Sequence, residues 1–180
     1  GQSNMQFPLK GFDNAPLKNG AAEIAGANQP KIRLLRVPLV GADYPESDVN
    51  AAWTDCTPET AAEFSAVAYF FGREISAKEN VPVGLIDSSW GGTPADSWVS
   101  MDTLGTDADL LPAFHARALF ADNEMRREEL EAINKARRAA GLPLPPPGWH
   151  PQQISWRPAA LYNAMISPLA PYSIRGFLWY

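Results

Sequence analysis

Apolar residues gather in three short runs that predict the strands of the chain. Residues 31–37 (KIRLLRV) form a run that Pro38 ends, so we expect a strand there. Residues 83–86 (VGLI) form a second run, which we interpret as a buried parallel strand. Residues 174–180 (IRGFLWY) predict a third strand. The polar stretches at residues 1–30 and 38–56 are expected to be loops.

A helical spacing of apolar residues predicts a long helix over residues 58–78. Thr57 precedes Pro58, and a hydroxyl followed by a proline is typical of a helix start. Asn80 and the Val-Pro pair after it are expected to end the helix. The stripe expected to be buried consists of Phe64, Val67, Ala68, Phe71 and Ile75.

The second half of the chain predicts further helices around a proline-rich stretch. Residues 107–140 are mostly helix formers with interleaved charges, so we expect one or two helices that end at Gly141. Residues 143–147 are rich in proline and predict an extended linker. Residues 158–170 predict a short helix that Pro168 breaks.

Strands alternating with helices predict an α/β fold with a mainly parallel sheet. Ligands of such sheets bind beyond the carboxyl ends of the strands, where the Gly-rich turn after Ile86 lies. Residues 1–4 (GQSN) have no apolar strand before them, and the third strand ends at the last residue. We therefore expect the fold to be incomplete at both ends.

Composition and charge narrow the function classes. With 180 residues, 46% of them apolar, the chain is long enough for one domain with a sizeable core. A net charge of −5 without a basic stripe argues against nucleic acid as a partner. No run of 18 apolar residues predicts a membrane span, and no signal peptide is visible. Cys56 is the only cysteine and is expected to be a small buried hydrophobe.

Two segments carry candidate chemistry. A serine near glycine, such as Ser3 after Gly1, can expose its hydroxyl and its own backbone N–H to an ester. Gly91 and Gly92 follow the second predicted strand, and glycine lets backbone N–H groups approach an oxyanion closely. Taken alone, the first segment is a weak signal and the second is compatible with a purely structural turn.

Together the two segments resemble the sialate O-acetylesterase family of the SGNH-hydrolase superfamily. The resemblance rests on four segments spaced along the chain, and the region of residues 100–157 matches less clearly and is expected to be a variable helical insertion. The four segments are GQSNM at residues 1–5, FSAVAYFFGRE at 64–74, VGLIDSSWGGTPADSW at 83–98 and LYNAMISPLAPYSIRGFLWY at 161–180.

The resemblance implies a three-layer α/β/α sandwich and a serine esterase. Ser3 matches the family nucleophile, and its backbone N–H is expected to be one oxyanion donor. Gly91, slightly favoured over Gly92, is expected to supply another. No metal or organic cofactor is implied. The residues expected to contact the substrate are Gln2, Asn4, Trp90 and Trp98.

The chain also departs from the family pattern. The family's Gln-Gly-Glu segment and its Asp-x-x-His segment, which supplies the catalytic aspartate and histidine, are both absent from residues 1–180. The resemblance implies that they lie beyond Tyr180, so we expect this chain alone to be inactive or nearly so. His115 and His150 lack the Asp-x-x-His setting, and His150 with Trp149 fits a cleft lining better.

Two carboxylates in the Gly-rich segment remain to be placed. Asp87 is expected to hydrogen-bond the backbone of the turn that follows it rather than to take part in catalysis. Asp96, in the PADSW segment, is expected either to orient that turn or to face sugar hydroxyls.

Three functions stay open on the sequence. The first is removal of O-acetyl groups from sialic acids, and the second is the same reaction on plant glycans such as xylan or pectin. The third is a non-catalytic sugar-binding module. The resemblance implies an O-acetylated sugar as partner and a secreted or periplasmic location, and the oligomeric state stays open. The stacking platform of a binding module would consist of Trp53, Trp90, Trp98, Trp149 and Trp156.

Overall fold

The computed structural model describes residues 1–112, 114–115, 123–144 and 153–179. These residues divide into two compact units. The first unit consists of Gly1–Leu39, Glu46–Gly92 and Met165–Tyr180, and the second consists of Val40–Pro45 and Thr93–Ala164. The prediction of one partial esterase domain with an insertion at residues 100–157 stays a prediction.

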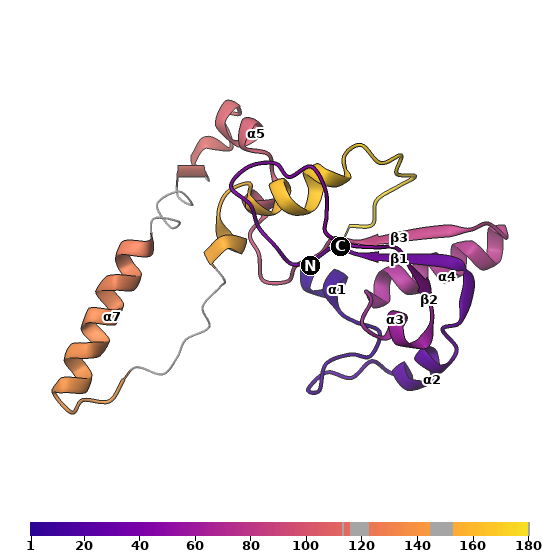
Figure 1. The fold of residues 1–180 in the computed structure, drawn as a ribbon, viewed down its shortest axis with the longest axis horizontal. Coiled ribbons are helices and arrows are strands. Elements are labelled where there is room, and N and C mark those ends of the chain that lie inside the picture. The colour runs from indigo at the N-terminus through magenta and orange to yellow at the C-terminus, as the bar shows by residue number, and fades with distance from the viewer. Residues whose placement is uncertain (113, 116–122, 145–152, 180) are drawn as a thin grey trace. The chain divides into compact units, whose positions relative to one another are not determined.

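A three-stranded mixed sheet forms the centre of the first unit (Figure 1). Strand β1 (Gln29–Arg36) lies between β2 (Thr54–Cys56) and β3 (Val83–Asp87). β1 pairs in parallel with β3 and antiparallel with β2. The predicted strands at residues 31–37 and 83–86 are therefore confirmed, and the fold is α/β. The sheet is mixed rather than mainly parallel, because β2 pairs antiparallel with β1. β2 lies within residues 38–56, which were predicted as a loop.

The third predicted strand is wrong for its described residues. Residues 174–179 form neither helix nor strand, and Phe177 and Trp179 are 85% and 90% exposed. An apolar run predicts a strand only where a neighbouring edge can take up its N–H and C=O groups. β2 escaped prediction for the opposite reason: three residues are too few to show an alternating pattern, yet β1 satisfies their backbone.

The long helix predicted over residues 58–78 is divided in two. Thr57 caps α3 (Pro58–Ala62), as predicted, and Ser65 caps a second helix, α4 (Ala66–Glu79). The division has a visible cause in the chain that follows Pro8. The N–H groups of Leu9 and Lys10 donate to the carbonyls of Phe64 and Ala62, which a continuous helix would have used itself.

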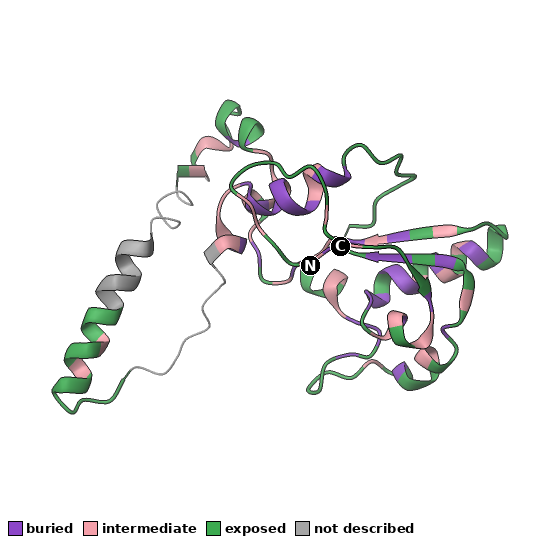
Figure 2. Cartoon of the chain, in the orientation of Figure 1, coloured by how far each residue is buried: buried purple, intermediate pink, exposed green. Residues whose placement is uncertain are grey.

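The buried face of α4 also differs from the predicted stripe. The helix contacts β3 and β1, and its buried residues include Tyr69, Gly72 and Ser76. Within α4, Ala68 of the predicted stripe is buried as expected, whereas Val67 and Phe71 are 37% and 45% exposed. Figure 2 shows buried and exposed residues along the same helix. This face is the buried one because α4 lies very close to β3 there. A Cβ at Gly72 would lie only 2.6 Å from a methyl of Leu85. Small residues let α4 lie near the sheet, and a pattern of large apolar residues cannot reveal such a face.

The hydrophobic core lies between the sheet and the helices α3 and α4. Its largest members come from the sheet, from Phe64 and α4, and from the segment after α1 (Gln2–Gln6), whereas α3 contributes only Ala61. The predicted burial of Cys56 and Phe64 is confirmed. A second short helix, α2 (Gly20–Ala25), also lies in the region predicted as loop. The core residues include Leu9, Ile32, Leu34, Cys56, Phe64, Tyr69 and Leu85.

Helices dominate the second unit. They include the 3-10 helix η1 (Ala95–Trp98), α5 (Met101–Thr106), the 17-residue helix α7 (Asn123–Ala139) and the 3-10 helix η2 (Gln153–Trp156). The π-helix η3 (Tyr162–Ile166) begins in the second unit, and its last two residues belong to the first. The predicted helices at residues 107–140 and 158–170 are thus present in part. The 3-10 helix η4 (Ser167–Leu169) follows in the first unit with Pro168 in its first turn. Among the described residues, no helix is long and apolar enough to cross a membrane.

Candidate active site

Ser3 and the Gly-rich turn meet at the carboxyl end of the sheet in the first unit. Ser3 is an exposed residue in α1, and Gly91 lies in the turn that follows β3. A Cβ built on Gly91 would lie 3.1 Å from Ser3 Oγ and 3.2 Å from Ser3 Cα. The two segments are separated by more than eighty residues, so the sheet and α4 bring together the two sequence motifs that carry the candidate chemistry.

The backbone N–H of Gly91 already has an acceptor in this state. It donates to Gln6 Oε1 at 2.7 Å, and Gln6 follows Ser3 by three residues, which places both side chains on one face of α1. The side-chain oxygen of Gln6 thus accepts the hydrogen bond of the Gly91 N–H, which lies close to the Ser3 hydroxyl. A substrate oxygen would have to replace Gln6 as acceptor before it could use the Gly91 N–H.

Glycine is favoured at position 91 for a steric reason. A side chain there would meet Gln6 Oε1 at 2.9 Å and Ser3 Oγ at 3.1 Å, both closer than ordinary contacts. Gly92 adopts a positive φ of 76°, which favours glycine for a conformational reason. The contacts of Gly91 place its backbone beside Ser3, and the positive φ of Gly92 serves the turn.

The other predicted substrate-binding residues lie in different surroundings. Gln2 and Asn4 are exposed in α1, on either side of Ser3. Trp90 is only 9% exposed and belongs to the turn itself. Trp98 lies in the second unit, where its indole N–H donates to Thr93 Oγ1 at 2.9 Å. A substrate contact for each of these four stays a prediction.

Asp87 ends β3 and is buried beneath the turn. Its carboxylate accepts hydrogen bonds from the Ser89 hydroxyl and from the backbone N–H of Ser65. Burial raises the pKa of Asp87 above its ordinary value, and the Ser89 bond, the charge of Arg36 and the Ser65 bond oppose that rise. The expected contact with the turn is therefore present, but through the Ser89 side chain, and the backbone contact goes to α4 instead.

The remaining sequence candidates belong to the second unit or lie outside the described residues. Asp96 lies in η1, where its backbone carbonyl accepts from the Ala159 N–H at 3.0 Å. His115 is exposed on a helical segment beside Phe114. Trp149 and His150 lie outside the described residues. Within the described part of the chain, no three His, Cys, Asp or Glu side chains gather as a metal site would require.

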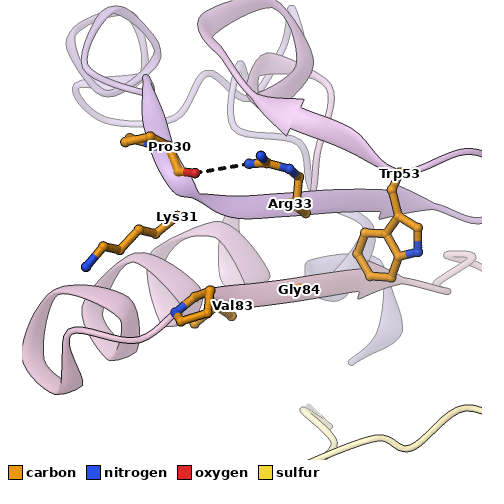
Figure 3. A pocket seen from close by; sticks show the side chains of 7 residues that line it. Pro30, Lys31, Arg33, Trp53, Val83 and Gly84 are labelled. Carbon is orange, nitrogen blue, oxygen red and sulfur yellow. Dashed lines mark hydrogen bonds between the residues drawn. The ribbon is translucent and has the colours of Figure 1, made fainter.

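An open pocket lies at the opposite, amino end of β1 and β3 (Figure 3). The indole of Trp53 lies against the backbone of Gly84, where an added Cβ would meet the ring at 3.1 Å. The two cations of the pocket are already engaged, since Lys31 bonds Asn80 and Arg33 pairs with Asp55 at 3.0 Å. The lining consists of Pro30, Lys31, Arg33, Trp53, Pro82, Val83 and Gly84.

Comparisons with known proteins agree with the sequence motifs. The whole chain aligns with sialate O-acetylesterase from Homo sapiens at 30% identity over 193 residues, and with that from Rattus norvegicus at 28% identity. Along its whole length, the chain is similar to sialate O-acetylesterases. The resemblance stated from the motifs is thereby confirmed. The chain spans 29% and 33% of the lengths of these two relatives.

A comparison with solved structures also finds similarity to an acetylesterase. A carbohydrate acetylesterase from Xanthomonas citri matches 98% of this chain with a TM-score of 0.65 and 28% sequence identity. The chain covers 30% of that protein. No protein-family model matches the chain.

Two residues near the site, Gln6 and Ser65, were not predicted from the sequence. Gln6 lies directly after the GQSNM segment, and its spacing of three from Ser3 was the available signal. Ser65 caps α4 and contacts Asp87 through its backbone. A Ser followed by a helical pattern signals a cap, but the partner of its N–H depends on tertiary packing.

Proposed function

We propose that the natural protein is a serine carbohydrate esterase that removes O-acetyl groups, with sialic acids as the first substrate class. The observation that carries the proposal is the position of Ser3 Oγ next to the Gly91 backbone, in a chain similar to sialate O-acetylesterases over its whole length. A nucleophile and a backbone donor side by side are what acyl transfer requires.

The proposed reaction passes through an acetyl-enzyme. Ser3 Oγ attacks the acetyl carbonyl and loses its proton to a base, while the sugar oxygen leaves with a proton. The carbonyl oxygen becomes an oxyanion, which the N–H groups of Gly91 and Ser3 stabilise. The Gly91 N–H must first lose its hydrogen bond to Gln6 Oε1. Water then hydrolyses the acetyl-Ser3 ester and releases acetate.

The general base of this mechanism would be the histidine of the family's Asp-x-x-His segment. No Asp-x-x-His segment is present among residues 1–180. We propose that such a segment of the natural protein provides the histidine and the aspartate. In the same way, we propose that the complete domain is a three-layer α/β/α sandwich in which the helix α4 belongs to one outer layer. A secreted or periplasmic location is part of the same proposal.

The substrate class has one serious competitor. The structural neighbour from Xanthomonas citri is described as a carbohydrate acetylesterase, without restriction to sialic acids. Acetylated plant glycans such as xylan or pectin are therefore the second candidate. A sugar-binding module without catalysis is the third, and the exposed ring of Trp53 in the amino-end pocket is the observation that favours it.

The test is acetate release by the natural full-length protein and its Ser3→Ala variant. The substrates are O-acetylated sialic acid, acetylated xylan, acetylated pectin and a simple acetyl ester. We expect release from the sialic acid that falls at least about 10³-fold in the variant. Release from xylan or pectin alone would shift the substrate class. Release from none of the four, with glycan binding retained, would contradict the enzyme and favour the binding module.

A further inference from the structure

Both halves of the candidate site are attached to the first residues of α4. The Ala66 N–H donates to the Phe7 carbonyl at 2.8 Å, and Phe7 directly follows the helix that carries Ser3. The N–H of the preceding residue, Ser65, donates to the Asp87 carboxylate, and Asp87 directly precedes the Gly-rich turn. Two adjacent amides at the start of α4, those of the N-cap Ser65 and of Ala66, therefore hold the two segments that meet at Ser3 and Gly91.

Asp87 is the side-chain link in this arrangement. Its backbone carbonyl accepts from the Val37 N–H at 2.9 Å, so the sheet fixes its main chain. Its carboxylate joins the Ser65 amide of α4 to the Ser89 hydroxyl within the turn. Asp87 is only 8% exposed, and a buried carboxylate that binds two donors is more rigid than an exposed one.

We propose that Asp87 is a positioning residue for the Ser3–Gly91 pair. It holds the turn at the start of α4, which also holds the Ser3 segment, and so sets the spacing between the nucleophile and the backbone donor. The proposal rests on the proposed role of Ser3. Asp87 acts through Ser89 and Ser65, and the structure gives it no contact with Ser3 itself. A displacement of about 1 Å between reacting groups costs up to about 10²-fold in rate.

The test compares three variants of the natural full-length protein. Asp87→Ala removes both hydrogen bonds, Asp87→Asn keeps one acceptor in nearly the same shape, and Ser89→Ala removes only the link to the turn. Asp55→Asn is the matched control, because Asp55 is an exposed aspartate of the same sheet that pairs with Arg33. Acetyl-ester hydrolysis gives kcat and KM, and a fluorophosphonate that labels Ser3 counts the competent sites.

We expect kcat per labelled site to fall at least about tenfold in Asp87→Ala, with KM within threefold of the parent. Asp87→Asn and Ser89→Ala should lie between Asp87→Ala and the parent, and Asp55→Asn should match the parent. A merely structural role would lower the number of labelled sites and leave kcat per site unchanged. That result, or equal losses in Asp87→Ala and Asp55→Asn, would overturn the proposal.

Amide hydrogen exchange gives a readout that does not depend on activity. In Asp87→Ala, exchange should accelerate at least about tenfold in residues 88–92, while the amides of α4 around Gly72 stay as protected as in the parent. If the parent protein neither hydrolyses acetyl esters nor reacts with the label, the proposed function fails. The hydrogen exchange of residues 88–92 still tests whether Asp87 holds the turn. Unchanged exchange at residues 88–92 would overturn the role of Asp87 in either case.

Discussion

The two ends of the β1–β3 pair carry candidate sites of opposite kinds. At the carboxyl end, Ser3, Gly91 and Asp87 come from distant segments, and hydrogen bonds join them through α1 and α4. At the amino end, an open pocket is lined by Trp53 and Gly84, and its cations are bonded to neighbours. The comparison teaches that a hollow surface is a weaker guide to chemistry than a nucleophile held next to a backbone donor.

The largest predicted difference between the two ends comes from a matched pair of glycine substitutions. Gly91→Ala places a Cβ 2.9 Å from Gln6 Oε1 and 3.1 Å from Ser3 Oγ, which displaces the donor from the nucleophile. We expect kcat/KM for an acetyl ester to fall by about 10²-fold, the effect of losing one oxyanion donor.

Gly84→Ala is the control at the amino end. Its Cβ would meet the Trp53 ring at 3.1 Å, a similar crowding without a candidate nucleophile nearby. Steady-state kinetics should show a change below about twofold. Similar losses of kcat/KM in Gly91→Ala and Gly84→Ala would contradict the assignment of the active site to the carboxyl end.

A pH effect on stability sharpens the contrast further. Because burial raises the pKa of Asp87 above 3.8, the folded protein keeps a proton that the unfolded chain has already released. The unfolded state then binds fewer protons, so the free energy of unfolding falls as pH rises from about 4 to the folded pKa of Asp87. Asp87→Asn cannot show this fall.

The measurement is urea unfolding of the parent and of Asp87→Asn over that pH range. The stability of Asp87→Asn relative to the parent should increase with pH and level off once Asp87 is ionised in both states. A difference that stays constant, or that shrinks as pH rises, would show that the folded protein does not disfavour the carboxylate.

The third prediction concerns Trp53 at the amino end. Trp53 is 40% exposed and lies against Gly84 on the outer face of the sheet. Trp53→Ala should leave kcat/KM for the simple acetyl ester within about twofold, because the ring lies at the end of the strands away from Ser3. A tenfold loss would place the amino-end pocket in the esterase mechanism and would favour a joint site.

The smallest effect is expected from the ion pair of the same pocket. Arg33 and Asp55 lie 3.0 Å apart, and their side chains are 50% and 72% exposed. Solvent screens such a pair, so Arg33→Met should change the free energy of unfolding by no more than about 1 kcal/mol. Denaturant unfolding checks the value, and a loss well above that figure would mean that the pair is shielded in the natural protein.

The comparison also separates what the sequence could predict from what it could not. Two strands were predictable because β1 and β3 carry short apolar runs, and the residues of these runs that are buried are Ile32, Leu34, Leu35 and Leu85. The Thr57 cap was predictable because capping is local. The meeting of Ser3 and Gly91 was expected from the family resemblance and not from spacing, since no local pattern links residues so far apart.

The misses share a physical cause, which is dependence on a distant partner. The division between α3 and α4 depends on Leu9 and Lys10, which take two carbonyls from that region. The buried face of α4 depends on how closely Gly72 lets it approach Leu85. The contact of Asp87 with Ser65, and of Gln6 with Gly91, likewise depends on packing that no single segment encodes.

The most direct test of the central claim is to locate the reactive serine by covalent labelling. The natural full-length protein is treated with a fluorophosphonate and digested, and peptide mass spectrometry identifies the modified residue. We predict one adduct, on the peptide that contains Ser3, which is absent after prior exposure to an acetyl ester in excess and absent in Ser3→Ala. An adduct on a different serine, with acetyl-ester hydrolysis intact in Ser3→Ala, would contradict it.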